Sequence, residues 1–314
     1  MTGPARLVRP RRVAEVSALL GGARPVAGGT DLLVQRRAGA PHHSLVDLTG
    51  LEDAPPPLRV TAGPSPSLVL SAVAPIAVVV DALDGRFPAL ADAAAFFASQ
   101  QIRNRATIGG NLATGSPAAD TVPPLLAAGA VVTIRGADGE REAPLEDFLL
   151  GPRAVDLRPA EWILAVTVPA PPAAGGYRKV GGRRALAISF LDLAWQWRAD
   201  DGVLRDVRLA MGSVAPTVVR LRGAEAELEG RRVTPDVAHA AIAAVQADIH
   251  PIDDLRASAG YRRRCAAGLL REALGSIDAR HPHPAASHTH LALPTTSTSC
   301  EHPTCPVSAG DIVA

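Results

Sequence analysis

The chain has 314 residues and a formal net charge of +1; 47% of its residues are hydrophobic and 20% are charged. This near-neutral balance, with aromatic residues at only 3%, argues against binding to nucleic acid or to a membrane surface. No run of eighteen apolar residues predicts a membrane span, and the N-terminus lacks the apolar stretch of a secretory signal. We therefore expect a cytoplasmic globular protein with room for two domains.

The cysteine content limits the metal chemistry that the chain can support. Its three cysteines are Cys265, Cys300 and Cys305, an odd number that predicts no disulfide framework. Three thiolates also fall short of the four that an iron–sulfur cluster normally takes. The histidines and cysteines of the C-terminal tail match no standard zinc spacing. We assign no metal site.

The first sixty residues have the pattern of a small α/β unit. Apolar residues at helical spacing over residues 11–22 end in two glycines, which predicts a helix and its stop. A short strand over 25–27, a turn over 28–30, a helix over 31–37 and a strand over 44–51 should follow.

The middle of the chain alternates helical and strand patterns. The apolar run at residues 66–81 is interrupted by Pro75 and is too short to span a bilayer. A helix is predicted over 87–104, leading into a glycine-rich segment. After Asp120 we expect a short helix, two strands joined by the turn GADGE, and a further strand over 161–169.

The last part of the chain follows a linker rich in proline and glycine at residues 169–176. A meander of strands is predicted to follow, with ADDG as a hairpin turn. Two amphipathic helices should cover 234–249 and 258–274. From residue 276 the composition is rich in Pro, Ser, Thr and His, which predicts a disordered tail.

Two glycine-rich segments share one chemistry. Residues 27–31 read AGGTD and residues 107–111 read TIGGN. Glycine leaves no Cβ in the way and permits positive φ, so that successive amides can point at one anion. A single Gly-Gly pair more often marks a turn, but two such loops suit a diphosphate. Neither a G-x-G-x-x-G after a strand nor a P-loop is present, so a nucleotide site here would belong to neither class.

These segments resemble the FAD-binding subunit of the molybdenum hydroxylases, which include xanthine and carbon monoxide dehydrogenases. The resemblance rests on AGGTDL (27–32) and QIRNRATIGGNLATGSPAAD (101–120). It continues through YRKVGGRRALAIS (177–189), GSVAPT (212–217) and DIHPIDDLRASAGYRRR (248–264). The last of these stretches is most similar to xanthine dehydrogenases.

The resemblance implies an α+β fold built around FAD. Residues 1–170 would form an FAD-binding domain of the vanillyl-alcohol-oxidase (PCMH) type, with subdomains at about 1–55 and 56–170. Residues 171–275 would form a small C-terminal α+β domain with a three-stranded antiparallel sheet and helices. Residues 276–314 would be the disordered tail.

The resemblance also implies which residues contact the cofactor. Two segments would close on the pyrophosphate from opposite sides. Asp120 would accept from the ribityl or ribose hydroxyls, Lys179 would lie near the flavin, and Ser116 would be a further cofactor contact. No side chain is assigned a catalytic role. The residues are Ala27, Gly28, Gly29, Thr30, Asp31 and Leu32; Thr107, Ile108, Gly109, Gly110 and Asn111; and Ser116, Asp120 and Lys179.

Several of these residues have simpler interpretations. Asp120 could cap the following helix instead of binding hydroxyl groups. Lys179, the only lysine of the chain, could be a solvated surface residue. Arg103 and Arg105 could pair with FAD phosphates, although we favour bracing of the loop.

Further along the chain, two charged runs receive structural interpretations. Asp253 and Asp254 are expected to cap a helix rather than to form a paired-carboxylate active site. The arginines at 262–264 are expected to lie on a solvated or partner-facing helix surface.

The resemblance implies a role in electron transfer. Substrate would be hydroxylated at a molybdopterin-containing large subunit, and electrons would cross the [2Fe–2S] clusters of a small subunit to FAD in this chain. NAD+ or another acceptor would then be reduced. Within the class, a carbon monoxide, aldehyde or N-heterocycle dehydrogenase is the alternative to a xanthine dehydrogenase-like enzyme. A non-catalytic FAD-binding scaffold and a free-standing flavin oxidase remain alternatives of other classes.

Overall fold

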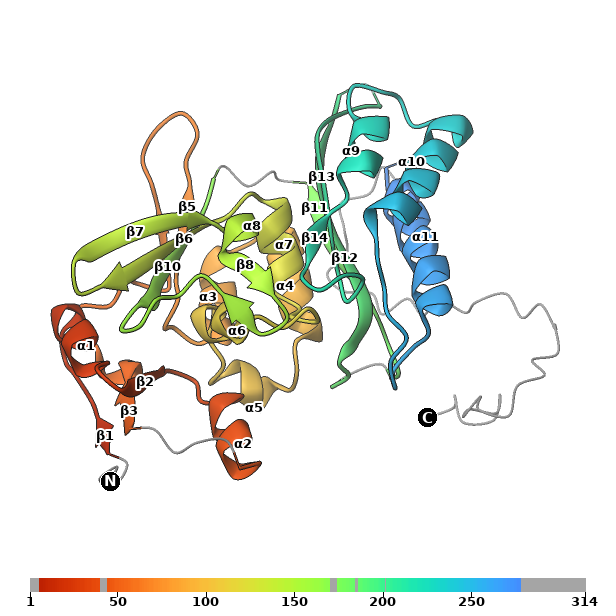
Figure 1. Ribbon diagram of the computed structural model, residues 1–314. Helices are drawn as coiled ribbons and strands as arrows, with labels where there is room; N and C mark the ends of the chain where they lie inside the picture. Colours follow the sequence, from red (N-terminus) through yellow and green to blue (C-terminus); the bar gives the residue numbers. More distant parts are fainter. Residues whose placement is uncertain (1–5, 40–43, 170–173, 184–185, 201, 278–314) are drawn as a thin grey trace. The chain divides into compact units, whose positions relative to one another are not determined.

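The N-terminal residues form a three-stranded parallel sheet (Figure 1). Its order is β1 (Leu7–Val8), β3 (Ser44–Asp47), β2 (Ala23–Val26). Parallel strands need crossover connections, and α1 (Val13–Leu19) and α2 (Leu32–Arg37) occur in those connections. The small α/β unit predicted from the sequence is thus confirmed for the described residues, which in this computed structural model are 6–39, 44–169, 174–183, 186–200 and 202–277.

The strand predicted over 44–51 is shorter than expected. Asp47 Oδ1 accepts hydrogen bonds from the Thr49 amide at 2.9 Å and the Thr49 hydroxyl at 2.7 Å. This local bonding competes with strand pairing. It starts the 3-10 turn η1 (Leu48–Gly50), which ends the strand.

The second sheet has five strands, all paired antiparallel. In spatial order they are β4 (Leu58–Val60), β5 (Leu68–Ser71), β10 (Trp162–Val168), β6 (Val131–Gly136) and β7 (Gly139–Pro144). The apolar run at 66–81 divides at Pro75, with β5 before it and α3 (Ile76–Leu83) after it.

Between α3 and β6 the chain is helical, and the remaining short elements follow β7. The helices are α4 (Pro88–Phe96), α5 (Gln100–Arg103), α6 (Ile108–Thr114) and α7 (Val122–Ala127). After β7 come α8 (Leu145–Phe148) and the two-stranded ladder of β8 (Leu149–Gly151) and β9 (Ala154–Val155).

Two predictions for this helical stretch were wrong. The helix expected over 87–104 breaks after Phe96, because Ala98 has φ of 43° and Ser99 starts α5 by accepting from the Ile102 amide. The TIGGN segment is not an open loop but the beginning of α6, because Thr107 caps the helix through the Gly110 amide. Gly115, with φ of 59°, ends it.

The C-terminal sheet is antiparallel and has four strands, not three. Its order is β11 (Gly175–Gly181), β12 (Ser189–Asp200), β13 (Val203–Gly212), β14 (Val219–Arg220). The additional strand arises because the chain after GSVAPT turns back and pairs with Ala210 and Met211. The linker predicted over 169–176 ends two residues earlier, since β11 already begins at Gly175. Residues 170–173 of this linker lie outside the described part of the chain.

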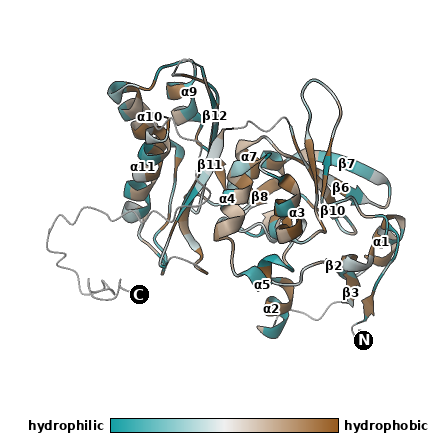
Figure 2. Cartoon of the chain, turned by 180° about the vertical axis from the view of Figure 1, so that it is seen from behind, coloured by the Kyte–Doolittle hydropathy of each residue, from teal (hydrophilic) through white to brown (hydrophobic). Residues whose placement is uncertain are grey.

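Three helices follow the sheet: α9 (Arg222–Leu228), α10 (Pro235–Asp248) and α11 (Ala259–Gly275). They lie on one side of it in Figure 1, and in Figure 2 α10 and α11 carry both hydrophobic and hydrophilic colour, as helices with one face on a sheet should. Both predicted amphipathic helices are confirmed. Except for its first two residues, the predicted tail lies outside the described residues.

The C-terminal sheet is buried on both faces. Leu191, Leu193 and Trp195 point into the cluster that contains α9, α10 and α11. Ala194 and Ala210 point instead into the cluster built from the five-stranded sheet and its helices. Alternate residues of β12 therefore serve two cores, and the polar side chains of Asp192 and Gln196, which alternate with Leu191, Leu193 and Trp195, are buried as well.

No helix in the described part of the chain is long and apolar enough to cross a membrane.

The larger core predicts a strong effect of truncating Leu70. This residue of β5 is fully buried, so Leu70→Ala should lower the free energy of unfolding by about 2–5 kcal/mol in urea titrations. Leu255→Ala, the same change at a residue 96% exposed, should cost less than about 0.5 kcal/mol. Equal losses in the two variants would contradict the assignment of Leu70 to the core.

Candidate cofactor site

The AGGTDL segment presents a run of backbone donors. Ala27 follows β2 and packs against the cluster of the parallel sheet, and Gly29 turns the chain with φ of 70°. The amides of residues 28–32 donate to no described residue. Consecutive free amides at such a turn form a concave anion site, and Thr30 adds a hydroxyl with no partner in the described part.

The TIGGN segment uses its amides inside the protein. The Gly109 amide donates to the Ala72 carbonyl, the Gly110 amide to Thr107 Oγ1 and the Asn111 amide to the Thr107 carbonyl, each at 3.0 Å. Gly109 is a glycine because a Cβ there would lie 2.7 Å from the Ala72 carbonyl oxygen. Ile108 is buried and serves the core. The sequence had predicted that both segments offer free amides. This was wrong for residues 109–111, whose amides are bonded within the protein.

The fold nevertheless brings the two segments together. A Cβ on Gly28 would lie 2.2 Å from the Arg105 carbonyl oxygen and 2.9 Å from Ala106 Cα. The Thr114 hydroxyl, at the end of α6, lies 3.3 Å from Asp31 Oδ2, which also accepts from Gln35. Only glycine at position 28 permits this approach of backbone to backbone.

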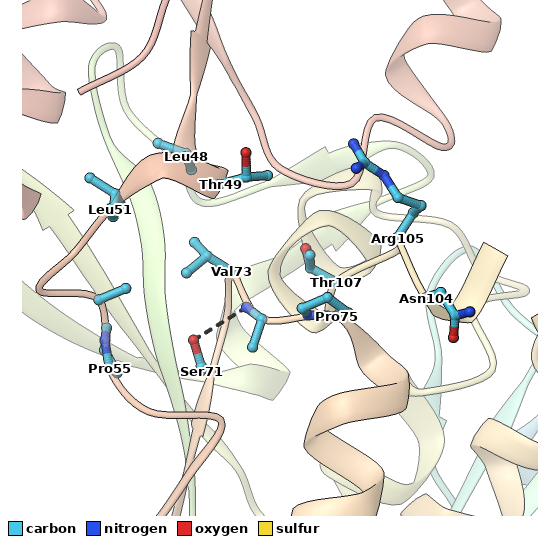
Figure 3. A pocket seen from close by; sticks show the side chains of 12 residues that line it. Leu48, Thr49, Leu51, Pro55, Ser71, Val73, Pro75, Asn104, Arg105 and Thr107 are labelled. Carbon is cyan, nitrogen blue, oxygen red and sulfur yellow. Dashed lines mark hydrogen bonds between the residues drawn. The ribbon is translucent and has the colours of Figure 1, made fainter. Parts of the chain in front are cut away.

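A cavity of about 310 Å³ lies beside this approach, between the parallel sheet and the end of β5. Figure 3 shows Leu48 and Thr49 on one side of it and Arg105 and Thr107 on the other. Its size is at the lower end of the range for small-molecule sites. Its lining combines apolar side chains with hydroxyl groups and one guanidinium.

The two arginines of the QIRNR stretch have different roles. Arg103 donates to the carbonyls of Phe97 and Ala98 and to Gln100 Oε1, so that it braces the loop as expected. The Arg105 side chain lines the cavity instead and has no hydrogen-bond or ionic partner among the described residues. Our preference for bracing was therefore wrong for Arg105.

Asp120 and Lys179 form a buried ion pair. Lys179 Nζ lies 2.8 Å from Asp120 Oδ2, and the two side chains are 6% and 10% exposed. Tyr177 donates its hydroxyl to Asp120 Oδ1 at 3.0 Å. Both simpler interpretations were wrong, because Asp120 does not cap α7, whose N-cap is Thr121, and Lys179 is not a surface residue.

The remaining predicted residues join these groups. Ser116 Oγ accepts from the Ala118 amide and shapes the turn that leads to Asp120. Asn111 Oδ1 accepts from the Thr121 hydroxyl at 2.6 Å, which ties α6 to the residue after Asp120. Leu32 is half-buried at the start of α2.

Burial dominates the electrostatics of this region. It raises the pKa of Asp120 above its ordinary value, although the charge of Lys179 and the hydrogen bonds from Lys179 and Tyr177 oppose the rise. Burial and the nearby charges of Asp192 and Asp120 raise the pKa of Tyr177 well above its ordinary value. Tyr177 therefore stays a hydrogen-bond donor at neutral pH.

Sequence reasoning missed two residues of this region, Tyr177 and Asp192, and it named a phosphate contact for Arg105 only as the less favoured alternative. Tyr177 lies two positions from Lys179 and thus on the same face of β11, which was a usable signal. Nothing in the sequence placed Asp192 opposite Lys179, because that requires the register of β11 and β12.

The charged runs near α11 are structural. Asp253 accepts from the Ala259 amide in the first turn of α11, as expected, although Ser258 is the N-cap of that helix. Asp254 does not cap α11, because it accepts from the loop amides of Arg256 and Ala257. Arg262 is 4% exposed and pairs with Asp254, which corrects the expectation of a solvated surface for this residue.

Comparison with known proteins identifies the family of the chain. Residues 3–171 match the model for the FAD binding domain in molybdopterin dehydrogenase, and residues 176–277 match that for the CO dehydrogenase flavoprotein C-terminal domain. The chain is 30% identical to the carbon monoxide dehydrogenase medium chain of Hydrogenophaga pseudoflava, over 86% of this chain and 96% of that one. It is 34% identical to the putative xanthine dehydrogenase FAD-binding subunit of Escherichia coli K12, over 76% and 83%.

A solved structure of carbon monoxide dehydrogenase from Hydrogenophaga pseudoflava superimposes with a TM-score of 0.81 at 30% identity, covering 89% of this chain and 99% of that one. The chain therefore belongs to the FAD-binding subunits of the molybdenum hydroxylases. It is a flavoprotein subunit of an oxidoreductase, and FAD is its cofactor.

The residues present fit a dinucleotide. The amides of residues 28–32 and the guanidinium of Arg105, which have no partners within the described ranges, are donors suited to a pyrophosphate. The cavity beside them has apolar walls that suit a ring system.

The approach at Gly28 yields a first prediction for the site. Gly28→Ala should force apart the segments at 28 and 105 and weaken FAD binding about tenfold or more, since the added Cβ meets backbone that cannot rotate away. Gly21→Ala, where an added Cβ meets nothing within 4 Å, should bind FAD like the wild type. Titration of the FAD-free protein with FAD measures both. Unchanged affinity in Gly28→Ala would contradict the arrangement.

The buried ion pair yields a prediction on stability. Lys179→Met leaves Asp120 charged, buried and without its cation, so the free energy of unfolding should fall by about 3–5 kcal/mol. Adding Asp120→Asn should recover part of this loss, because the two changes remove one shared interaction.

An exposed pair is the control. Arg231→Met breaks the ion pair with Glu227, whose side chains are 51% and 38% exposed, and should cost less than about 1 kcal/mol. Strict additivity of Lys179→Met and Asp120→Asn in urea unfolding would argue against the pair.

Proposed function

We propose that this chain is the FAD-binding subunit of a xanthine dehydrogenase-like molybdenum hydroxylase. It carries electrons from the [2Fe–2S] clusters of a small subunit to NAD+ or another acceptor. The organic substrate is oxidised at a molybdopterin-containing large subunit. The names of relatives support this, since they are medium chains or FAD-binding subunits of dehydrogenases.

We also propose the division of the chain at residue 170. The two matched family models change over between residues 171 and 176, close to the start of β11 at Gly175. The parallel sheet and the five-stranded sheet correspond to the proposed subdomains at about 1–55 and 56–170. A cytoplasmic location stays a prediction.

The proposed contacts divide the site into a part that binds the pyrophosphate and a part that binds the ribityl chain, ribose and flavin. Backbone amides of residues 28–32 and the guanidinium of Arg105 bind the pyrophosphate, with the hydroxyls of Thr30 and Thr107 beside them. Ser116, Asn111 and Asp120 face the ribityl or ribose hydroxyls, and Lys179 sets the charge near the flavin. When bound, FAD supplies a group that exchanges electrons with clusters and passes a hydride onward.

One observation carries this proposal: the backbone of residue 28 touches that of residues 105 and 106 at the edge of the cavity. The approach joins the segment with the free amides to the segment that carries Arg105, whose guanidinium has no partner among the described residues and lines the cavity. A scaffold that had lost FAD binding would have no reason to keep both the glycine and an unpaired arginine there.

A carbon monoxide, aldehyde or N-heterocycle dehydrogenase is the second candidate within the class. The relatives named carbon monoxide dehydrogenase medium chain align over 86% and 87% of this chain, a larger share than the 76% of the xanthine dehydrogenase subunits. The site described above serves both, because the substrate is bound by another chain.

Two experiments test the proposal. Co-expression with the neighbouring molybdopterin and iron–sulfur chains should give a stable complex with flavin absorbance; a chain that carries FAD but purifies alone would instead be a free-standing oxidase. Anaerobic addition of NADH should bleach the flavin absorbance if NAD+ is the natural acceptor. Unchanged absorbance with a functional complex would point to a different acceptor.

Arg105 yields a prediction specific to the pyrophosphate. Arg105→Gln removes a charged hydrogen-bond donor and should weaken FAD binding about tenfold, without a change in the unfolding midpoint of the FAD-free chain. Arg205→Gln, at an exposed residue of β13, should leave affinity unchanged. Equal affinity of both variants would remove Arg105 from the site.

A further inference from the structure

A buried group beside the ion pair has no role in the function proposed above. Asp192 on β12 is fully buried and stands directly opposite Lys179 of β11 and Gly212 of β13. Its Oδ1 accepts from the Gly212 amide at 3.0 Å. Its Oδ2 is buried and receives no hydrogen bond from the described residues.

The charges of this cluster do not balance. Among the described residues, Lys179 is the one cation that neighbours both Asp120 and Asp192; its Nζ lies 2.8 Å from Asp120 Oδ2 and 3.4 Å from the Phe96 carbonyl oxygen. Two ionised carboxylates with one ammonium would leave an uncompensated negative charge in the interior, which is strongly unfavourable. Since Asp120 has both the cation and the Tyr177 hydroxyl, Asp192 is the carboxyl that should carry a proton.

Asp192 is also connected to Asp120 through the backbone. Gly212, which donates to Asp192, precedes Ser213, whose amide donates to the Pro117 carbonyl at 2.8 Å. Pro117 belongs to the turn that ends at Asp120. A Cβ at position 212 would lie 2.5 Å from Asp192 Oδ1, so any larger residue there would displace the carboxyl. Asp192 thus lies opposite Lys179 in the sheet, and the residue that it bonds directly precedes the one that holds the turn carrying Asp120.

We propose that Asp192 is a neutral carboxylic acid in the native protein and the positioning residue of the Asp120–Lys179 pair, which loosens when Asp192 loses its proton. Protonated Oδ2 turns an unpartnered acceptor into a donor, and the hydroxyl of Tyr177 is the acceptor beside it. Tyr177 in turn donates to Asp120. Ionisation of Asp192 removes the proton that Oδ2 would donate to the Tyr177 hydroxyl. It also places a second negative charge near Asp120.

The groups around Asp192 favour this state. Burial, aided by the charge of Asp120, raises the pKa of Asp192 to about 7, against the opposing effects of Ser189, Lys179 and the Gly212 amide. On β11, Tyr177 and Lys179 face it, and α4 contributes the Phe96 carbonyl to Lys179. Arg178 lies on the opposite face of β11 and pairs there with Glu272 of α11.

The sign of the pH dependence follows from the raised pKa. The native state binds a proton at Asp192 that the unfolded chain has already released, so stability falls as pH rises from the unfolded value, near 4, to about 7. Asp192→Asn keeps the acceptor for Gly212 and offers an amide donor to Tyr177. This variant should lose that part of the pH dependence and become more stable than the wild type above pH about 8.

The direct test is infrared spectroscopy of the full-length, FAD-free chain. Wild-type protein should show the C=O stretch of a buried carboxylic acid near pH 5.5, and the band should disappear as pH rises through about 7. Asp192→Asn should lack the band, whereas Asp138→Asn, the same change at an exposed turn residue, should keep it. A wild-type chain without the band would overturn the proposal, and this measurement needs no variant to fold.

Two further measurements complete the test. Urea unfolding between pH about 5 and 9 should give the wild type and Asp138→Asn the same slope of unfolding free energy against pH, and Asp192→Asn a flatter slope. Three equal slopes would overturn the proposal.

Because the proposed function places Asp120 against FAD, FAD affinity should also weaken above pH about 7 in the wild type but not in Asp192→Asn. The infrared and unfolding results can agree with these expectations while FAD affinity shows no pH dependence. That outcome would contradict the proposed contact of Asp120 with FAD and would leave the protonation of Asp192 supported.

Discussion

The contact between residue 28 and the carbonyl of residue 105 is the constraint on which the site depends. No side chain can stand between these backbones, since even a Cβ would lie 2.2 Å from the carbonyl oxygen. This contact brings the turn after β2 of the parallel sheet to the turn between α5 and α6. The Arg105 side chain lines the cavity beside this contact, although 77 positions of sequence separate Gly28 from Arg105.

The sequence predicted much of this arrangement because local signals were strong. Helical spacing with a glycine stop located α1, amphipathic spacing located α10, and the paired Gly-Gly motifs identified the two segments proposed for the site. It failed where a short-range bond decided the outcome. Thr107 turned an apparent loop into α6 through the Gly110 amide, and Asp47 ended β3 through Thr49. The break in the helix predicted over 87–104 had no signal in the sequence either, because alanine normally continues a helix and Ala98 has φ of 43°.

The side-chain partners were the least predictable part. Asp120 and Lys179 are 59 positions apart, and their pairing depends on β11 meeting the turn after α6. Asp192 enters only through the register that sets it opposite Lys179. Registers follow from which face of each strand is buried, and β12 is buried on both faces, so the alternation that normally reveals the inward face was absent. The solitary lysine was a better clue than any pattern.

The two halves of the site therefore use glycine for different purposes. Gly28 permits contact with another segment and leaves its neighbouring amides free for an anion, whereas Gly109 and Gly212 permit contacts that consume amides within the protein. Gly109 holds α6 against the end of β5, and Gly212 accommodates the carboxyl of Asp192. Bare backbone near a cofactor thus has two functions here: one glycine exposes donors, and the others fix the elements that keep those donors in place.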